Sequence, residues 1–188
     1  VWAIGNIAGD SPELRDEVLN QNIVPILTRR LDAELSLPAR KQHPSFMRNA
    51  VWTIANICRG KPPPSFGKVR GVIPVLGRAI ETNDQEMQAD ACWALNYLGD
   101  GDHERIQALV EAGVCARLVE LMEHPAQTVK TPALRDVGNV VTGDDSQTEH
   151  ILALGALARL RNLLVDTRHT IRGEAYWTIS NITAGNHM

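Results

Sequence analysis

A tryptophan followed four residues later by an asparagine recurs along the 188-residue chain. Three pairs have this form and two are variants of it: Trp2/Asn6, Trp52/Asn56 and Trp177/Asn181, with Trp93/Tyr97 and Arg135/Asn139 as the variants. Their first members are separated by 50, 41, 42 and 42 residues. Residues four apart on a helix share one face, so each pair forms a two-part surface. The chain is therefore expected to be built from repeats, each of which presents this surface on a helix.

A period near 42 residues is the range found in armadillo and HEAT arrays. The last complete repeat contains three segments with helical apolar spacing, at 146–154, 156–165 and 169–184, and three helices favour armadillo over two-helix HEAT repeats. We predict an all-α fold, an armadillo-repeat right-handed superhelical solenoid with three helices per repeat and the pair on the third helix. The predicted parts of this single solenoid are the end of one repeat at 1–10, then repeats at 11–60, 61–101, 102–143 and 144–185.

The connections between helices are marked by proline, glycine and charged residues. Asp32–Phe46 is expected to be a surface-loop insertion that accounts for the longer first period, and Lys61–Pro64 is expected to be a stiff linker. Each third helix is followed by a glycine that is expected to adopt positive φ and reverse the chain: Gly9, Gly60, Gly101, Gly143 and Gly185. Val1 enters the pattern without a helix cap, so we interpret the chain as an interior piece of a longer array.

Charge and composition argue against several classes of protein. A net charge of −3 disfavours a nucleic-acid partner. There is no apolar run long enough to cross a membrane and no secretory signal, and Cys58, Cys92 and Cys115 are expected to be reduced and buried in an intracellular protein. The histidines and cysteines match no metal pattern and no catalytic motif is present, so we expect no enzyme activity and no cofactor.

Third helices placed side by side would align the pairs as columns of indoles and carboxamides, which we call the ladder. Carboxamides can hydrogen-bond the backbone of an extended peptide, and neighbouring indoles leave a slot for a lysine stem, with cation–π attraction of about 0.5–2 kcal/mol. Carboxylates near the ladder could receive the charge of a basic side chain: Asp10, Asp90, Asp100, Asp144, Asp145 and Glu174. Arg135 is expected either to interrupt the slots or to pair with an acid. The ladder therefore predicts an extended, basic ligand.

These residues resemble the importin-α (karyopherin-α) family over essentially the whole chain. The most telling stretches are Val1–Asp10, Arg48–Gly60, Ala89–Leu98, Pro132–Gly143 and Trp177–Gly185, in the order Trp, Trp, Trp-Tyr, Arg, Trp. The resemblance is to the third to seventh of the family's repeats and implies an adaptor that binds nuclear localisation signals for import. It departs from the family at Asp136, where a small residue is usual, and around Pro38–Pro44.

The resemblance also implies two peptide sites. The major site would comprise Trp2, Asn6, Asp10, Trp52, Asn56, Asp90, Trp93 and Tyr97. The minor site would comprise Arg135, Asn139, Val141, Thr142, Thr148, Glu174, Trp177 and Asn181. Each would be partial, since the family uses one more row of the ladder before Val1 and another after Met188.

The partners implied by the resemblance are basic import signals of cargo proteins and importin-β, which would bind an N-terminal arm that this chain does not contain. Neither nucleic acid nor a membrane is expected, and the location would be the cytoplasm and nucleus, with shuttling between them. Two alternatives remain. One is an armadillo scaffold, such as the catenin kind with a basic groove for acidic partners, that binds another class of extended peptide unconnected with import. The other is an enzyme or metal protein.

Overall fold

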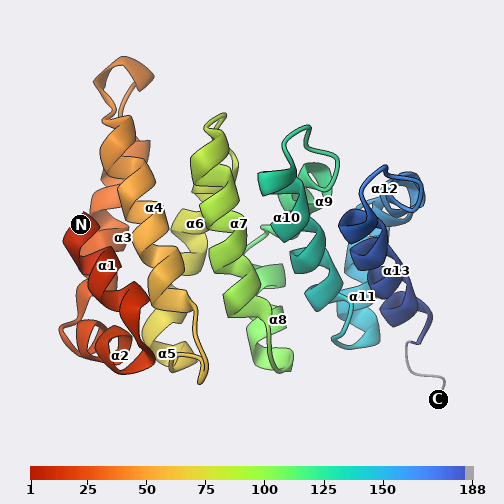
Figure 1. The fold of residues 1–188 in the computed structure, drawn as a ribbon, viewed down its shortest axis with the longest axis horizontal. Helices are drawn as coiled ribbons and strands as arrows, with labels where there is room; N and C mark the ends of the chain where they lie inside the picture. Colours follow the sequence, from red (N-terminus) through yellow and green to blue (C-terminus); the bar gives the residue numbers. More distant parts are fainter. Residues whose placement is uncertain (185–188) are drawn as a thin grey trace. The chain divides into compact units, whose positions relative to one another are not determined.

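The computed structural model of the chain describes residues 1–184 (Figure 1). The chain divides into two compact units, Val1–Leu98 (unit 1) and Gly99–Met188 (unit 2), which are described separately. Within residues 1–184 every regular element is helical. This confirms the all-α prediction, while the predicted boundaries of the repeats stay a prediction.

Unit 1 holds two complete sets of helices and the helix that precedes them. The helices are α1 (Trp2–Asp10), α2 (Pro12–Asn20), α3 (Ile23–Leu35), α4 (Pro44–Cys58), α5 (Phe66–Val69), α6 (Ile73–Ile80) and α7 (Gln85–Gly99), with 3-10 turns η1 (Ala39–Lys41) and η2 (Arg70–Val72). The ladder pairs lie on α1, α4 and α7.

Unit 2 repeats the three-helix scheme twice. Its helices are α8 (His103–Glu111), α9 (Cys115–Leu121), α10 (Gln127–Val140), α11 (Asp145–Ala153), α12 (Ala156–Leu163) and α13 (His169–Thr183). The ladder pairs lie on α10 and α13. Thus each of the five pairs lies within a helix, as the spacing predicted.

Side-chain caps start α2, α8 and α11, each the first helix of its set, whereas α5 has no such cap. The Ser11 hydroxyl accepts a hydrogen bond from the Leu14 N–H at 3.3 Å, and Asp102 accepts one from Arg105 at 3.2 Å. Asp144 and Gln147 form a reciprocal capping box, with bonds of 2.9 and 3.1 Å. These contacts satisfy N–H groups that have no partner within the helix, and so they fix where α2, α8 and α11 begin.

The predicted role of the recurrent glycines is largely wrong. Gly60 has positive φ, at 120°, but Gly9, Gly101 and Gly143 do not, and Gly185 lies outside the described residues. The left-handed glycines of unit 2 are Gly113 and Gly155, between the first and second helices of each set. The sharp reversal therefore falls at the short αα corner, where the chain has only a few residues in which to turn.

The predicted insertion is shorter than Asp32–Phe46. Helix α3 continues through Leu35 and α4 already begins at Pro44, which leaves 36–43 as the connection. Glu34, buried on α3, accepts hydrogen bonds from the backbone N–H of His43 and lies 2.6 Å from its ring Nδ1. This contact closes the base of the loop, and the His43 hydrogen bond lowers the pKa of Glu34.

Apolar side chains fill the space between helices in both units. Leu31, Ile54 and Leu76 in unit 1 are at most 1% exposed, as are Leu109 and Leu134 in unit 2. Burial of each such side chain stabilises the fold by about 1.5–3 kcal/mol. The side chains of Cys58, Cys92 and Cys115 are buried and form no disulfide bond, as predicted.

Arg15 is a buried cation that joins two parts of unit 1. Its side chain is 1% exposed, and its guanidinium donates hydrogen bonds to the carbonyls of Arg59 at 3.0 Å and Pro62 at 2.8 Å. Asp16 balances the charge at 2.8 Å. A Cβ at Gly60 would lie 2.7 Å from the guanidinium, so the connection after α4 wraps closely around it.

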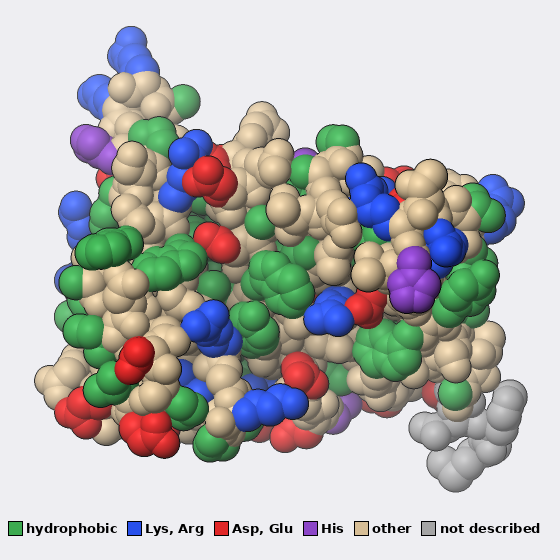
Figure 2. Space-filling view, in the orientation of Figure 1, with side chains coloured by type: hydrophobic (Ala, Val, Ile, Leu, Met, Phe, Trp, Pro, Cys, Tyr) green, Lys and Arg blue, Asp and Glu red, His purple; other side chains and the backbone are tan. Residues whose placement is uncertain are grey.

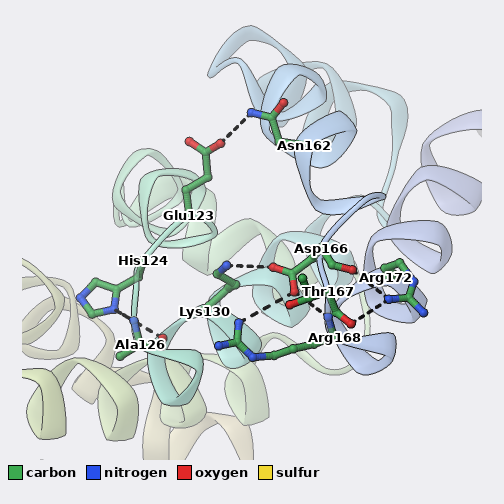
Figure 3. A network of polar contacts seen from close by, with 9 residues as sticks. All are labelled: Glu123, His124, Ala126, Lys130, Asn162, Asp166, Thr167, Arg168 and Arg172. Carbon is green, nitrogen blue, oxygen red and sulfur yellow. Dashed lines mark hydrogen bonds and ion pairs between the residues drawn. The ribbon is translucent and has the colours of Figure 1, made fainter.

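A polar network in unit 2 ties the connection between α12 and α13 to helix α10 (Figure 3). Lys130 on α10 pairs with Asp166 at 3.1 Å, and the Asp166 carboxylate also accepts from the Arg168 N–H at 2.9 Å. Arg172 donates to the Asp166 and Thr167 carbonyls at 2.8 and 3.0 Å. The Arg168 N–H and the Lys130 ammonium lower the pKa of Asp166 although burial opposes this. The turn before α13 is therefore fixed against α10.

Candidate peptide-binding site

The three ladder helices of unit 1 lie next to one another. Helix α1 packs on α4, and Arg48 of α4 pairs with Asp84 at the start of α7 at 2.8 Å. Figure 2 shows large hydrophobic side chains at the surface over these helices, with acidic and basic side chains among them. The exposed fraction of Trp2 is 64%, and Trp52 and Trp93 are half-buried, so the indoles line the surface rather than the core.

Each unit contains a tryptophan that packs against a glycine of the preceding ladder helix. A Cβ added at Gly5 of α1 would lie 2.4 Å from Cζ3 of Trp52, and one at Gly138 of α10 would lie 2.4 Å from Cζ3 of Trp177. Both distances are far below van der Waals contact. Glycine thus allows the indole of one row to rest on the backbone of the row before. The dipeptide Gly-Asn, which occurs at Gly5 and again at Gly138, is the sequence signal for this contact, which we did not predict.

The asparagines are less available to a ligand than the sequence suggested. Asn6 donates from Nδ2 to the carbonyl of Trp2 at 3.1 Å, within its own helix. Asn56 donates to the Gly5 carbonyl at 3.1 Å and is 6% exposed. A carboxamide has a second N–H and an acceptor oxygen for further bonds. These asparagines therefore stabilise the ladder itself.

The third row of unit 1 combines aromatic rings with a carboxyl group whose pKa is raised. The rings of Trp93 and Tyr97 are stacked, with centroids 6.0 Å apart and planes inclined by 24°. Asp90, one turn before Trp93, is half-buried, and burial followed by the Glu86 charge raises its pKa to about 6. Asp10 is exposed at the end of α1. All eight predicted major-site residues therefore lie in unit 1, on its three ladder helices.

Unit 2 presents a different arrangement around its two ladder helices. Arg135 on α10 donates to Glu174 on α13 at 2.7 Å, so the expected acidic partner of this arginine is found. The exposed fraction of Trp177 is 42%, while Nδ2 of Asn181 is enclosed without a hydrogen-bond partner among the described residues. A basic ligand would therefore share the Glu174 carboxylate with Arg135 or displace it.

The other predicted minor-site residues differ in accessibility. Asn139 is half-buried and Thr142 is exposed, with its hydroxyl donating to the Asn139 carbonyl at 2.7 Å. Val141 and Thr148 are 2% and 9% exposed. In this structure their side chains can support the site but do not present a contact surface.

The described residues contain no group of three side chains suited to hold a metal ion. No helix in residues 1–184 is long and apolar enough to span a membrane. The site thus offers indole faces, carboxamides and carboxylates, groups that suit an extended cationic ligand.

Known proteins are similar to this chain in sequence and in fold. The family description "Armadillo/beta-catenin-like repeat" matches residues 71–100 and 102–141. Importin subunit alpha-1b of Oryza sativa subsp. japonica is 50% identical over 142 residues, which is 76% of this chain and 25% of that protein. Importin subunit alpha-1a of the same species is 54% identical over 134 residues, 71% of this chain and 24% of that protein.

Among solved structures, a designed armadillo repeat protein in complex with the peptide (KR)4 is similar. Its TM-score is 0.86 at 28% identity, and the match covers 98% of this chain and 74% of that one. The five ladder pairs, each on a helix, and these matches together define an armadillo-repeat protein. Within that class, the chain belongs to the importin-α family, and it spans about a quarter of the length of the importin subunits that it matches.

Proposed function

We propose that the protein is an adaptor for nuclear import that binds Lys/Arg-rich localisation signals as extended peptides on its ladder. The observation that carries the proposal is the row of exposed or half-exposed indoles on adjacent helices of unit 1, with Asp10 and Asp90 beside them. The identity with importin subunits and the (KR)4 complex of a designed relative support it. We further propose that a protein containing this chain binds importin-β and shuttles between cytoplasm and nucleus, as membership of this family implies.

The ladder can be tested by titrating a fluorescently labelled Lys-Lys-Lys-Arg-Lys peptide and following its anisotropy at low and physiological salt. The double variant Trp2→Ala/Trp52→Ala and the variant Asp10→Lys should each lose at least about tenfold in affinity, which is about 1.4 kcal/mol. The reason is that they remove the slot for a lysine stem or reverse the charge beside it.

Tyr176→Ala is the matched control, because Tyr176 is an exposed aromatic residue one position away from the ladder tryptophan of α13. It should bind the peptide as the parent does. Parent-like affinity in the folded ladder variants would remove the proposed site, and a folded parent that fails to bind would refute the adaptor function for this chain.

The affinity for the same peptide should fall by about threefold between pH 7 and pH 5. Asp90, whose pKa is about 6, is mostly ionised at pH 7 and mostly neutral at pH 5. The peptide keeps its charge over this range, and a partly exposed ion pair contributes up to about 1 kcal/mol. The attraction between Asp90 and the peptide is therefore present above the pKa of Asp90 and is lost as the pH falls through that pKa.

Asp90→Asn is the control for this pH dependence. It should bind more weakly than the parent at pH 7 and equally at pH 5, so that the two titration curves converge. A parallel pH dependence in parent and variant would assign the effect to another group.

A further inference from the structure

The connection between α3 and α4, residues 36–43, projects beyond the helices of unit 1 (Figure 1), and we call it the 36–43 loop. Every residue from Ser36 to Lys41 is exposed, and even the apolar Leu37 is 38% exposed. Figure 2 shows Lys and Arg side chains at the tip of this projection. The loop therefore presents Arg40 and Lys41 where another protein can reach the backbone on either side of them.

The hydrogen bonds that hold the tip of the loop are all local. The Lys41 N–H donates to the Pro38 carbonyl at 2.7 Å, and the Gln42 N–H donates to the Ala39 carbonyl at 3.2 Å. The Gln42 side chain donates from Nε2 to the Leu37 carbonyl at 3.0 Å. Because none of these bonds reaches another helix, the tip can extend while the rest of unit 1 stays folded.

The base of the loop is held more firmly than its tip. Glu34, 7% exposed, accepts a hydrogen bond from the His43 N–H at 2.6 Å. Leu31 on α3 and Met47 on α4 are 0% and 3% exposed, so both flanking helices are anchored in the core. An opening of the tip therefore stops at the base and does not spread into α3 or α4.

The Lys and Arg residues after α4 are better protected. The Arg59 carbonyl accepts a hydrogen bond from the buried guanidinium of Arg15 at 3.0 Å, and the Arg59 side chain donates to the Gly9 carbonyl at 2.9 Å. Lys61 is followed by Pro62, whose ring crowds the bond that a Lys/Arg-specific protease would cut. Cleavage in this connection would require that the contacts of α1 and α2 break first.

The remaining Lys and Arg residues lie in helical elements, except for Arg168. The Arg168 N–H donates to the Asp166 carboxylate at 2.9 Å, within the network that fixes the turn before α13. Lys68 lies in the short helix α5 and donates to Asn20 at 2.6 Å. A helix must unwind before its backbone can enter a protease as an extended segment, so these sites are slower than the 36–43 loop.

We propose that the 36–43 loop is the site at which a trypsin-like serine protease first cuts this protein, after Arg40 or Lys41, and that the two pieces stay assembled. Cleavage after Lys41 adds one water molecule across the amide and breaks its C–N bond. It leaves a new carboxyl group on Lys41 and a new amino group on Gln42.

Contacts that cross the cut hold the two pieces together. Helix α1 packs on α4, and α3 packs on both α4 and α6. Asn56 of the second piece donates to the Gly5 carbonyl of the first at 3.1 Å, and Arg15 of the first piece donates to the Arg59 carbonyl of the second. Leu31 stays buried between them. The first row of the ladder would then be carried by a separate polypeptide that is bound without a covalent link.

The test is limited digestion of the 188-residue chain with trypsin, followed by mass spectrometry and size-exclusion chromatography. The first products should be residues 1–40 or 1–41 and the complementary C-terminal pieces. At about 20 μM they should elute together at the position of the intact chain and separate only in urea, since assembly of a nicked protein depends on its concentration. A first cut elsewhere, or pieces that separate without urea, would overturn the proposal.

The double variant Arg40→Gln/Lys41→Gln should lose intact chain at least about tenfold more slowly than the parent, because the next sites open less often. Arg29→Gln/Arg161→Gln is the matched control, since it makes the same change of charge at two exposed arginines within α3 and α12. It should be cut as fast as the parent. Equal rates for the two double variants would show that the loop is not the first site.

Discussion

Replacing Asp136 with alanine should raise the free energy of unfolding of unit 2 by about 1–3 kcal/mol at pH 7, the cost of a buried polar group without partners. Asp136 is 0% exposed and neither of its carboxylate oxygens has a hydrogen-bond partner among the described residues. Burial raises the pKa of Asp136 well above its usual value, and burial together with the Asp136 charge raises the pKa of the Cys115 thiol to about 12. The gain corresponds to about 2–4 °C in Tm per kcal/mol.

The pH dependence of this gain has a definite sign. The pKa of Asp136 is higher in the folded than in the unfolded state. Below the unfolded pKa of about 4 the carboxyl is protonated in both states, so it adds no pH-dependent destabilisation. As the pH rises above about 4 the unfolded state loses the proton more readily, and the folded state becomes less stable relative to it. Alanine should therefore stabilise more at pH 7 than at pH 4, as measured by urea unfolding. Asp136→Asn keeps a buried polar group without a charge, so it should remove the pH dependence. A loss of stability in Asp136→Ala at both pH values would contradict the assignment of Asp136 as a destabilising group.

The second large effect is expected for Gly138→Ala, which should lower stability by about 1–2 kcal/mol and displace Trp177. The new Cβ would meet the Trp177 ring at 2.4 Å and the Thr178 hydroxyl at 2.9 Å. Overpacking of this kind costs about 1–3 kcal/mol, against which a helical alanine recovers up to about 1 kcal/mol. Thermal unfolding reports the first effect, and the indole N–H resonance of Trp177 reports the second.

Gly173→Ala provides the matched control on the neighbouring helix. Gly173 lies within α13, and a Cβ there would meet no atom within 4 Å. This variant should therefore gain about 0.5–1 kcal/mol from helix propensity and leave the Trp177 resonance in place. Equal stability of the two variants would show that the indole moves aside without cost.

The sequence predicted the fold well because its signals are local. Helical apolar spacing placed α11, α12 and α13 within a few residues of their observed bounds, since this signal acts within a few turns of one helix. The glycine prediction failed for Gly101 and Gly143 because recurrence alone does not distinguish a glycine needed for positive φ from one needed for space.

The details of the candidate site depended on contacts between helices. The Arg135–Glu174 pair was one of two outcomes that the sequence left open, and only the packing of α10 on α13 selects it. The hydrogen bond from Asn56 to the Gly5 carbonyl spans 51 residues. Such bonds cannot be predicted from a pattern within a single helix. They distinguish a ladder side chain that is available to a ligand from one that holds two ladder helices together.

Arg15 also bears on the order in which the chain can fold during synthesis. The carbonyls that accept its hydrogen bonds, those of Arg59 and Pro62, follow it by 44 and 47 residues. A cation buried before its acceptors arrive costs several kcal/mol. A nascent chain that has emerged from the ribosome only as far as Cys58, at the end of α4, offers Arg15 the Asp16 carboxylate but neither carbonyl acceptor. We therefore expect α2 to reach its native position fully only after the proline segment has emerged.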